Sequence, residues 1–179
     1  MNIQKLKFPI GKYNPGKNPN SELITQWIKQ IEDFPTSIED LCRNISLEQL
    51  NWRYRPEGWT VKQLIHHCSD SHMNSLIRFK LALTERSPTI KPYFEDRWAT
   101  LADSLDDNIE NSLSLLQGLH KKWVILLRSL NDEQLRMEYT HPEHGEKFNL
   151  AETIGNYAWH CNHHLAHIRK ALASNGKYN

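Results

Sequence analysis

Apolar side chains recur at helical spacing along four long stretches of the chain. The first begins after Ser21 and contains Leu23, Ile24, Trp27, Ile28 and Ile31. Pro35 should kink or divide this helix, because proline cannot donate the backbone hydrogen bond of a helix interior. The same pattern resumes at Ile38, Leu41 and Ile45. A capping box at residues 46–49 (SLEQ) leaves room only for a short helical turn before the loop WRYRPEGW.

The second and third stretches both have recognisable beginnings. Thr60 and Gln63 form a capping box, and the apolar stripe that follows continues to the break at SPT, residues 87–89. Its members are Val61, Leu64, Ile65, Cys68, Phe79 and Leu83. The third stretch follows the acidic segment SLDD, residues 104–107, which favours a helix N-terminus. Its stripe consists of Leu105, Ile109, Leu113, Leu116, Leu119, Trp123, Leu126 and Leu130.

The fourth stretch completes the fold prediction. Asn149 and Glu152 indicate its start, and Gly176 ends a helix that runs to about Asn175. The preceding segment EYTHPEHGEKF can form a small hairpin. Four amphipathic helices with no other strand pattern predict an all-α four-helix bundle. We expect one domain, residues 1–179, in which residues 1–20 form an irregular arm on the domain or on a partner subunit.

The composition narrows the class of function. The 22 Lys and Arg residues balance 21 Asp and Glu residues to a formal net charge of +1, without a long run of like charge. This balance disfavours a nucleic-acid or membrane partner and favours a small-molecule substrate. Neither a signal-peptide core nor a run of about 18 apolar residues is present, which predicts a cytoplasmic protein. The three cysteines form no CxxC pair and are expected to be packed thiols.

The candidate chemistry lies in two groups of histidines. The segment WHCNHHLAH, residues 159–167, contains four histidines in eight positions of the fourth helix. On a helical wheel His160 and His164 lie nearest the edge of the apolar stripe, and one helical turn separates them, so they can chelate one ion. His163 and His167 lie further out, where solvent exposure or a supporting hydrogen bond is the more natural interpretation.

A metal site needs a third ligand, which the second helix can supply. The segment HHCSDSH, residues 66–72, places His66 on the outer side of that helix and leaves both His67 and His72 possible. His67 has the same position relative to its stripe as His160 and His164. His72 falls inside the stripe and reads more naturally as a core histidine with a hydrogen-bond partner.

Three motifs together resemble those of a known family. They are RPEGWTVKQLIHHCSDSH, the loop HPEHG at residues 141–145, and WHCNHHLAHI near the C-terminus. The chain is similar to the DinB-like superfamily, and more closely to its YfiT branch, over residues 55–168. The resemblance implies a four-helix bundle, commonly a homodimer, that binds one divalent ion through His67, His160 and His164. The sequence does not depart from the motif at these three positions.

The resemblance also implies two activities. Members of this branch are described as metal-dependent hydrolases, in which the ion activates a water nucleophile. Relatives transfer low-molecular-weight thiols such as bacillithiol to electrophilic substrates, and a metal would hold such a thiol as the thiolate. A module that binds or senses metal without turnover is a third hypothesis. Imidazole ligands suit zinc, and also nickel.

No catalytic residue can be assigned from the sequence. A hydrolase needs a group that moves a proton to the leaving group, and Asp70, Glu143 and His144 are candidates. Together with His141 they can equally be ordinary surface or loop residues. His164→Ala should lose metal and keep its helix content, because His164 lies at the edge of the core.

Overall fold

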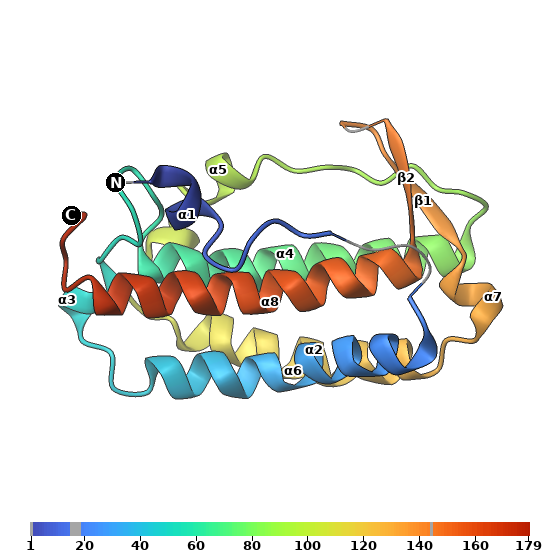
Figure 1. The fold of residues 1–179 in the computed structure, drawn as a ribbon, viewed down its shortest axis with the longest axis horizontal. Coiled ribbons are helices and arrows are strands. Elements are labelled where there is room, and N and C mark those ends of the chain that lie inside the picture. The colour runs from blue at the N-terminus through green and yellow to red at the C-terminus, as the bar shows by residue number, and fades with distance from the viewer. Residues whose placement is uncertain (1, 15–18, 144) are drawn as a thin grey trace.

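The computed structural model describes residues 2–14, 19–143 and 145–179 and contains the predicted helical bundle. Its long helices are α2 (Ser21–Cys42), α4 (Val61–Thr84), α6 (Glu110–Arg128) and α8 (Leu150–Ala173). Helix α2 packs on α6 and α8, and α4 packs on the same two helices. Consecutive long helices α2 and α4 therefore lie diagonally across the bundle (Figure 1).

Short elements connect and flank the long helices. They are α1 (Ile3–Lys7), α3 (Leu47–Leu50), α5 (Glu95–Trp98), the 3-10 helix η1 (Asp103–Leu105), α7 (Asp132–Leu135), β1 (Glu138–His141) and β2 (Glu146–Asn149). Strands β1 and β2 pair antiparallel, with Glu138 opposite Asn149, which confirms the predicted hairpin. The segments α1 and α5 both lie on the side of the bundle formed by α4 and α8 (Figure 1).

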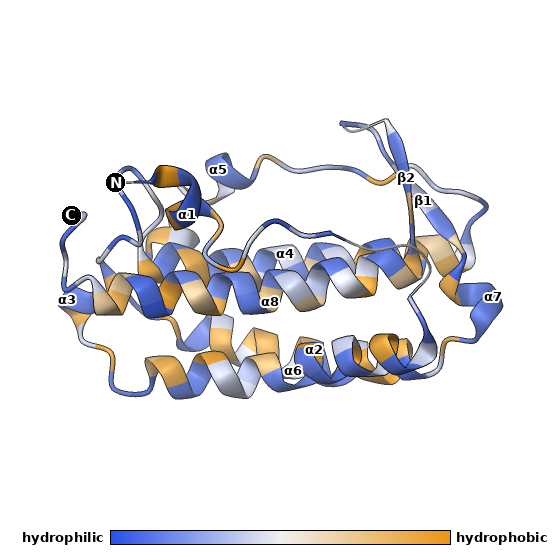
Figure 2. Ribbon diagram, in the orientation of Figure 1, coloured by the Kyte–Doolittle hydropathy of each residue, from blue (hydrophilic) through white to orange (hydrophobic). Residues whose placement is uncertain are grey.

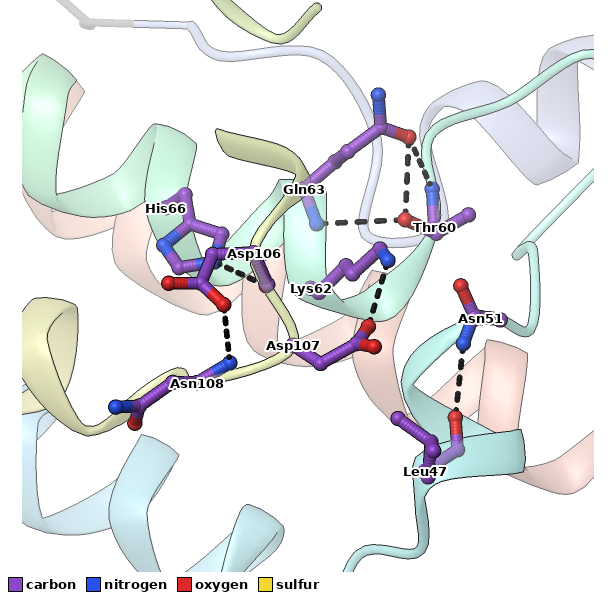
Figure 3. A network of polar contacts seen from close by, with 9 residues as sticks. All are labelled: Leu47, Asn51, Thr60, Lys62, Gln63, His66, Asp106, Asp107 and Asn108. Carbon is purple, nitrogen blue, oxygen red and sulfur yellow. Dashed lines mark hydrogen bonds and ion pairs between the residues drawn. The ribbon is translucent and has the colours of Figure 1, made fainter. Parts of the chain in front are cut away.

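The caps predicted from sequence set the starts of two long helices. The Thr60 side chain accepts from the backbone N–H of Gln63, while the Gln63 side chain accepts from that of Thr60 (Figure 3). Asn149 caps α8 by accepting from the backbone N–H of Glu152. Each cap satisfies N–H groups that a helix N-terminus leaves without partners. The two helices that contain the histidine groups thus begin where their sequences specify.

The interior is mostly apolar, and it also contains buried histidines and small polar side chains on α4, α6 and α8. Figure 2 shows hydrophobic positions on the inward faces of the helices and hydrophilic ones outside. The largest side chains with almost no exposure include Trp123, Phe34, Phe79, Ile31 and Ile154. The three cysteines, Cys42, Cys68 and Cys161, are buried free thiols, and burial raises their pKa values. Within the described part of the chain, no helix is both long enough and apolar enough for a bilayer crossing.

Three expectations need correction. Helix α2 continues through Pro35, so the alternative of a divided helix is wrong, and the carbonyl of Ile31, which loses its helical donor there, accepts a hydrogen bond from His120 Nδ1 at 2.6 Å. Helix α6 begins at Glu110, after the SLDD segment, and Leu105 is 45% exposed instead of buried. The N-terminal arm is not irregular throughout, because it contains helix α1, and it packs on this chain's own bundle, one of the two predicted positions.

The arm lies close against α8 because of one glycine. The Tyr13 hydroxyl donates to the backbone carbonyl of Glu152, and the Trp159 indole donates to that of Gly11. A Cβ at Gly155 would come within 2.6 Å of the Tyr13 hydroxyl oxygen and 2.8 Å of the Trp27 ring. A side chain at residue 155 would therefore force the arm and Trp27 to move.

Candidate metal centre

Helices α4 and α8 bring three imidazoles together. His67 extends from α4, and His160 and His164 extend from successive turns of α8. One ligand nitrogen from each of the three lies within 4.8 Å of the others. The Nε2 atoms of His67 and His160 are 3.3 Å apart, and the rings of His160 and His164 lie edge to face, 4.4 Å between centroids.

The donor set fits a divalent ion. Burial lowers the pKa of His67 to about 4 and holds the pKa values of His160 and His164 well below 6.5, so all three are neutral at pH 7. Two bare lone pairs 3.3 Å apart repel, so a proton or a cation must lie between these Nε2 atoms. Nitrogen ligands about 2.0–2.1 Å from a tetrahedral zinc ion would be roughly 3.3 Å apart.

The three imidazoles face a cavity of about 1150 Å³. The loop before α4 forms part of its wall, and Trp59 packs on His67 with 4.6 Å between ring centroids. Lys7, Phe8 and Tyr13 of the arm form another part, and the β1–β2 hairpin a third. The volume exceeds the roughly 300–1,000 Å³ of most ligand pockets.

His163 and His167 are buried, although the wheel placed them furthest from the core. His163 stacks on Trp159 at 4.2 Å and lies 5.9 Å from the Phe8 ring. His167 stacks on Tyr54 at 3.9 Å, and its Nε2 donates to the backbone carbonyl of Lys7 at 3.0 Å. The expectation of solvent exposure is wrong because the N-terminal arm covers this face of α8. His167 makes a hydrogen bond, which was the other predicted interpretation.

His66 is also buried, and its predicted outward position is wrong. Its Nδ1 lies 2.8 Å from the Ser112 hydroxyl, and its Nε2 lies 3.0 Å from the backbone carbonyl of Asp106. Lys62, one turn earlier on α4, binds Asp107 of the same segment (Figure 3). The segment that leads into α6 therefore covers the side of α4 that a wheel treats as exposed.

His72 is a core histidine with hydrogen-bond partners, as predicted. It has no exposed surface, and its Nδ1 and Nε2 contact His120 and His160 at 2.8 and 3.0 Å. His120 on α6 was missed by sequence reasoning. The available signal was its position four residues after Leu116, on the apolar stripe of the third helix.

Sequence comparison places these observations in a family. The sequence profile of the DinB superfamily matches residues 30–168. The chain belongs to the DinB superfamily. It is 50% identical over 166 residues to a Bacillus cereus (strain 03BB102) protein named "Putative metal-dependent hydrolase", covering 93% of this chain and 95% of that one. A Bacillus anthracis (strain A0248) protein of the same name matches with the same identity and coverage.

A solved structure has the same fold. YfiT from Bacillus subtilis, described as a probable metal-dependent hydrolase with an unusual four-helix bundle topology, superposes with a TM-score of 0.93. The two sequences are 42% identical, and the match covers 96% of this chain and 98% of YfiT. This chain is therefore similar to YfiT in the arrangement of its helices over nearly its whole length.

The side chains that the sequence suggested for proton transfer in this DinB superfamily protein differ in their position relative to the cavity. Asp70 is half-buried, and burial raises its pKa to about 6, but it is not among the described residues that line the cavity. His141 lines the cavity, and Glu143 lines a smaller adjoining one. His144 lies outside the described residues.

Sequence reasoning missed the carboxyl groups that line the cavity, which belong to Glu57, Glu95, Asp96, Glu146 and Glu152. Glu95 begins the short helix α5, where the residue is exposed, but partial desolvation of its carboxyl group raises its pKa while the nearby Arg78 opposes that shift. A carboxyl group with a raised pKa in the lining of a cavity that contains a candidate metal centre is suited to accept and return a proton. The sequence signal was weak, because Glu95 sits in a segment between helices with no motif of its own.

Proposed function

We propose that this chain is a metal-dependent hydrolase in which His67, His160 and His164 hold one divalent ion and a small molecule is the substrate. The observation that carries the proposal is the convergence of three neutral imidazoles from two helices on one cavity. Support also comes from the names of relatives that match nearly the whole chain. We propose zinc as the first ion to test and nickel as the second.

The chemistry needs few protein groups. A divalent ion bound to three neutral ligands is a Lewis acid that lowers the pKa of a coordinated water to about 7. Trp59 packs on the proposed ligand His67 and shields it, whereas Tyr54 packs on the neighbouring His167. We propose Glu95, which lines the cavity, as the group that accepts a proton from the nucleophile and returns it to the leaving group.

The size of the cavity favours a second candidate function. At about 1150 Å³ it has room for a substrate and a polar cosubstrate, and Arg55, Arg78 and Lys147 line it. We propose as the alternative a metal-dependent S-transferase that adds a low-molecular-weight thiol such as bacillithiol to an electrophile. A homodimer and a cytoplasmic location stay predictions.

Metal content and two assays test these proposals. We expect tag-free protein to bind about one zinc or nickel ion per chain. The loaded protein should then be assayed for hydrolysis of a panel of esters and amides, and for conjugation of bacillithiol to an electrophile such as monobromobimane. Metal binding with hydrolysis supports the first proposal, and metal binding with conjugation alone supports the second. Absence of metal after incubation with both ions would contradict both.

Replacing Glu95 by glutamine should slow the reaction without removing the metal. Loss of a proton-transfer group typically costs about 10²–10⁴-fold in rate, and we expect kcat to fall in this range while metal stoichiometry stays at the wild-type value. Asp70→Asn is the matched control, since it neutralises a carboxyl whose pKa is also raised but which lies away from the cavity lining. Equal kcat values for Glu95→Gln and wild type would exclude this role.

A further inference from the structure

A line of hydrogen bonds between histidines crosses the bundle and touches all four long helices. It starts at His160 on α8, whose Nδ1 lies 3.0 Å from His72 Nε2 on α4. His72 Nδ1 lies 2.8 Å from His120 Nε2 on α6. His120 Nδ1 in turn lies 2.6 Å from the backbone carbonyl oxygen of Ile31 on α2. The line thus connects a candidate metal ligand to a backbone group on the other side of the core.

The carbonyl at the end of this line sets the direction of every bond in it. A carbonyl oxygen only accepts, so His120 Nδ1 must carry a proton, and in a neutral ring Nε2 is then an acceptor. His72 Nδ1 must therefore donate to His120, which makes His72 Nε2 an acceptor. His160 Nδ1 must then donate to His72, which leaves the lone pair of His160 on Nε2. This is the atom that faces His67.

Proline supplies the free carbonyl. In an uninterrupted helix the Ile31 carbonyl would accept from the backbone N–H of residue 35, and Pro35 has none. The Ile31 carbonyl is therefore available to His120, and that bond in turn satisfies a buried backbone group. Pro35 in the middle of α2 thus leaves free the carbonyl that anchors the line of histidines.

A second, shorter line imposes the same arrangement on His164. His167 Nε2 lies 3.0 Å from the backbone carbonyl of Lys7, at the end of helix α1, so this nitrogen donates. His167 Nδ1 is then an acceptor, and the nitrogen 3.4 Å from it is His164 Nδ1. His164 Nδ1 must donate, which again leaves the lone pair on Nε2.

We propose that His72, His120 and His167 are positioning residues that hold His160 and His164 as Nδ1–H tautomers, with both Nε2 lone pairs directed at the site. As a role toward a metal, this rests on the proposed function. The Ile31 and Lys7 carbonyls anchor the two lines independently. A metal-ligating histidine commonly donates its other ring N–H in this way, which fixes the tautomer and the orientation of the ring.

The surroundings of His72 exclude competing partners. Its ring lies 5.1 Å from Phe34, 5.9 Å from Trp123 and 5.5 Å from Tyr157, measured between ring centroids. Neither His72 nor His120 has more than 1% of its surface exposed. Water therefore has little access to these rings, and the histidines depend on one another for hydrogen bonds.

Nuclear magnetic resonance of metal-free, ¹⁵N-labelled protein at neutral pH reads the tautomers directly. Two-bond ¹H–¹⁵N correlations distinguish Nδ1–H from Nε2–H rings, and free histidine in water favours Nε2–H. We expect Nδ1–H for His72, His120, His160 and His164, and Nε2–H for His167. An Nε2–H tautomer at His160 and His164 in the wild-type protein would overturn the proposal, whether or not any variant folds.

Variants of His120 separate positioning from packing. His120→Leu removes the link to the Ile31 carbonyl, whereas a glutamine at this position can donate to that carbonyl and still accept from His72. We expect His120→Leu to release the His160 tautomer and weaken Zn²⁺ binding by about 10–100-fold, and His120→Gln to retain most of both properties. His66→Leu is the control, because it also removes a buried, hydrogen-bonded histidine but one outside the two lines.

The tautomer of His160 and the affinity for Zn²⁺ test different parts of the proposal. If the His160 tautomer is unchanged in His120→Leu, the positioning role is wrong, even where that variant is less stable. If His66→Leu weakens Zn²⁺ binding as much as His120→Leu does, a general packing effect replaces the positioning role. Wild-type protein with the expected tautomers but no affinity for Zn²⁺ would retain the assignment of the two lines and remove the proposed function.

Discussion

His164→Ala protein is expected to lose its metal and to retain its helices. The substitution removes one of three ligands, so the loss in affinity should exceed the roughly 10–100-fold that changes in supporting residues cause. His164 is 7% exposed and lies where α8 meets the cavity, not among the central apolar side chains. Elemental analysis of purified protein measures the metal, and far-ultraviolet circular dichroism measures the helix content.

The matched control for this substitution is His66→Ala. His66 is also a buried histidine with two hydrogen-bonded ring nitrogens, but these bind Ser112 and the Asp106 carbonyl. We expect His66→Ala to lower the free energy of unfolding while the metal stoichiometry stays at the wild-type value. Unfolding of His164→Ala together with wild-type metal binding by its folded fraction would contradict the assignment of His164 as a ligand.

Metal-free protein is expected to unfold as the pH falls from about 6.5 to 4. Burial lowers the pKa values of seven histidines, to about 4 for His67, His120 and His163 and to about 3 for His167, with His72, His160 and His164 well below 6.5. The unfolded chain binds protons at these positions below pH 6.5 and the folded chain does not. Stability is therefore complete above pH 6.5 and is lost as the pH falls toward the folded-state values.

The expected decrease in the free energy of unfolding is large relative to the total stability of a domain. The shift of His67 alone, from 6.5 to about 4, corresponds to roughly 3 kcal/mol, and a typical domain is stable by only about 5–15 kcal/mol. Asp70 and Glu95 have raised pKa values and act in the opposite direction, but two carboxyl groups do not offset seven imidazoles. Urea unfolding curves at several pH values, with EDTA present, measure the effect. An unchanged free energy of unfolding between pH 7 and 5 would contradict it.

Helix positions follow from local sequence, and these predictions hold. The capping boxes at Thr60 and Ser46 and the cap at Asn149 are formed as expected, because a cap requires only residues a few positions apart. The same locality explains why His160 and His164 are side by side: one turn of α8 separates them whatever surrounds the helix. The start of α6 was less predictable, since several acidic residues in succession could each begin a helix.

The wheel fails where a second segment covers a helix face that a simple bundle would expose. His66 is buried by the segment that leads into α6, and His163 and His167 by the N-terminal arm. A helical wheel assigns one buried face to each helix and takes no account of other segments that pack on a second face. The alternative that Pro35 divides the helix failed for a related reason, because the donor that replaces its missing N–H is His120, 89 residues from Ile31.

The sequence by itself determined the four long helices, their caps and the pairing of His160 with His164, since each depends on spacing within one segment. On residues alone it left both His67 and His72 possible, although the position of His67 matched that of His160 and His164, and the resemblance then decided for His67. The tertiary structure decides what each of these two contacts: both nitrogens of His72 bind other histidines, whereas His67 Nε2 faces His160 Nε2 from 93 residues away. Helical periodicity gives the direction of a side chain about its own axis, but which side chains meet depends on how the helices pack against one another.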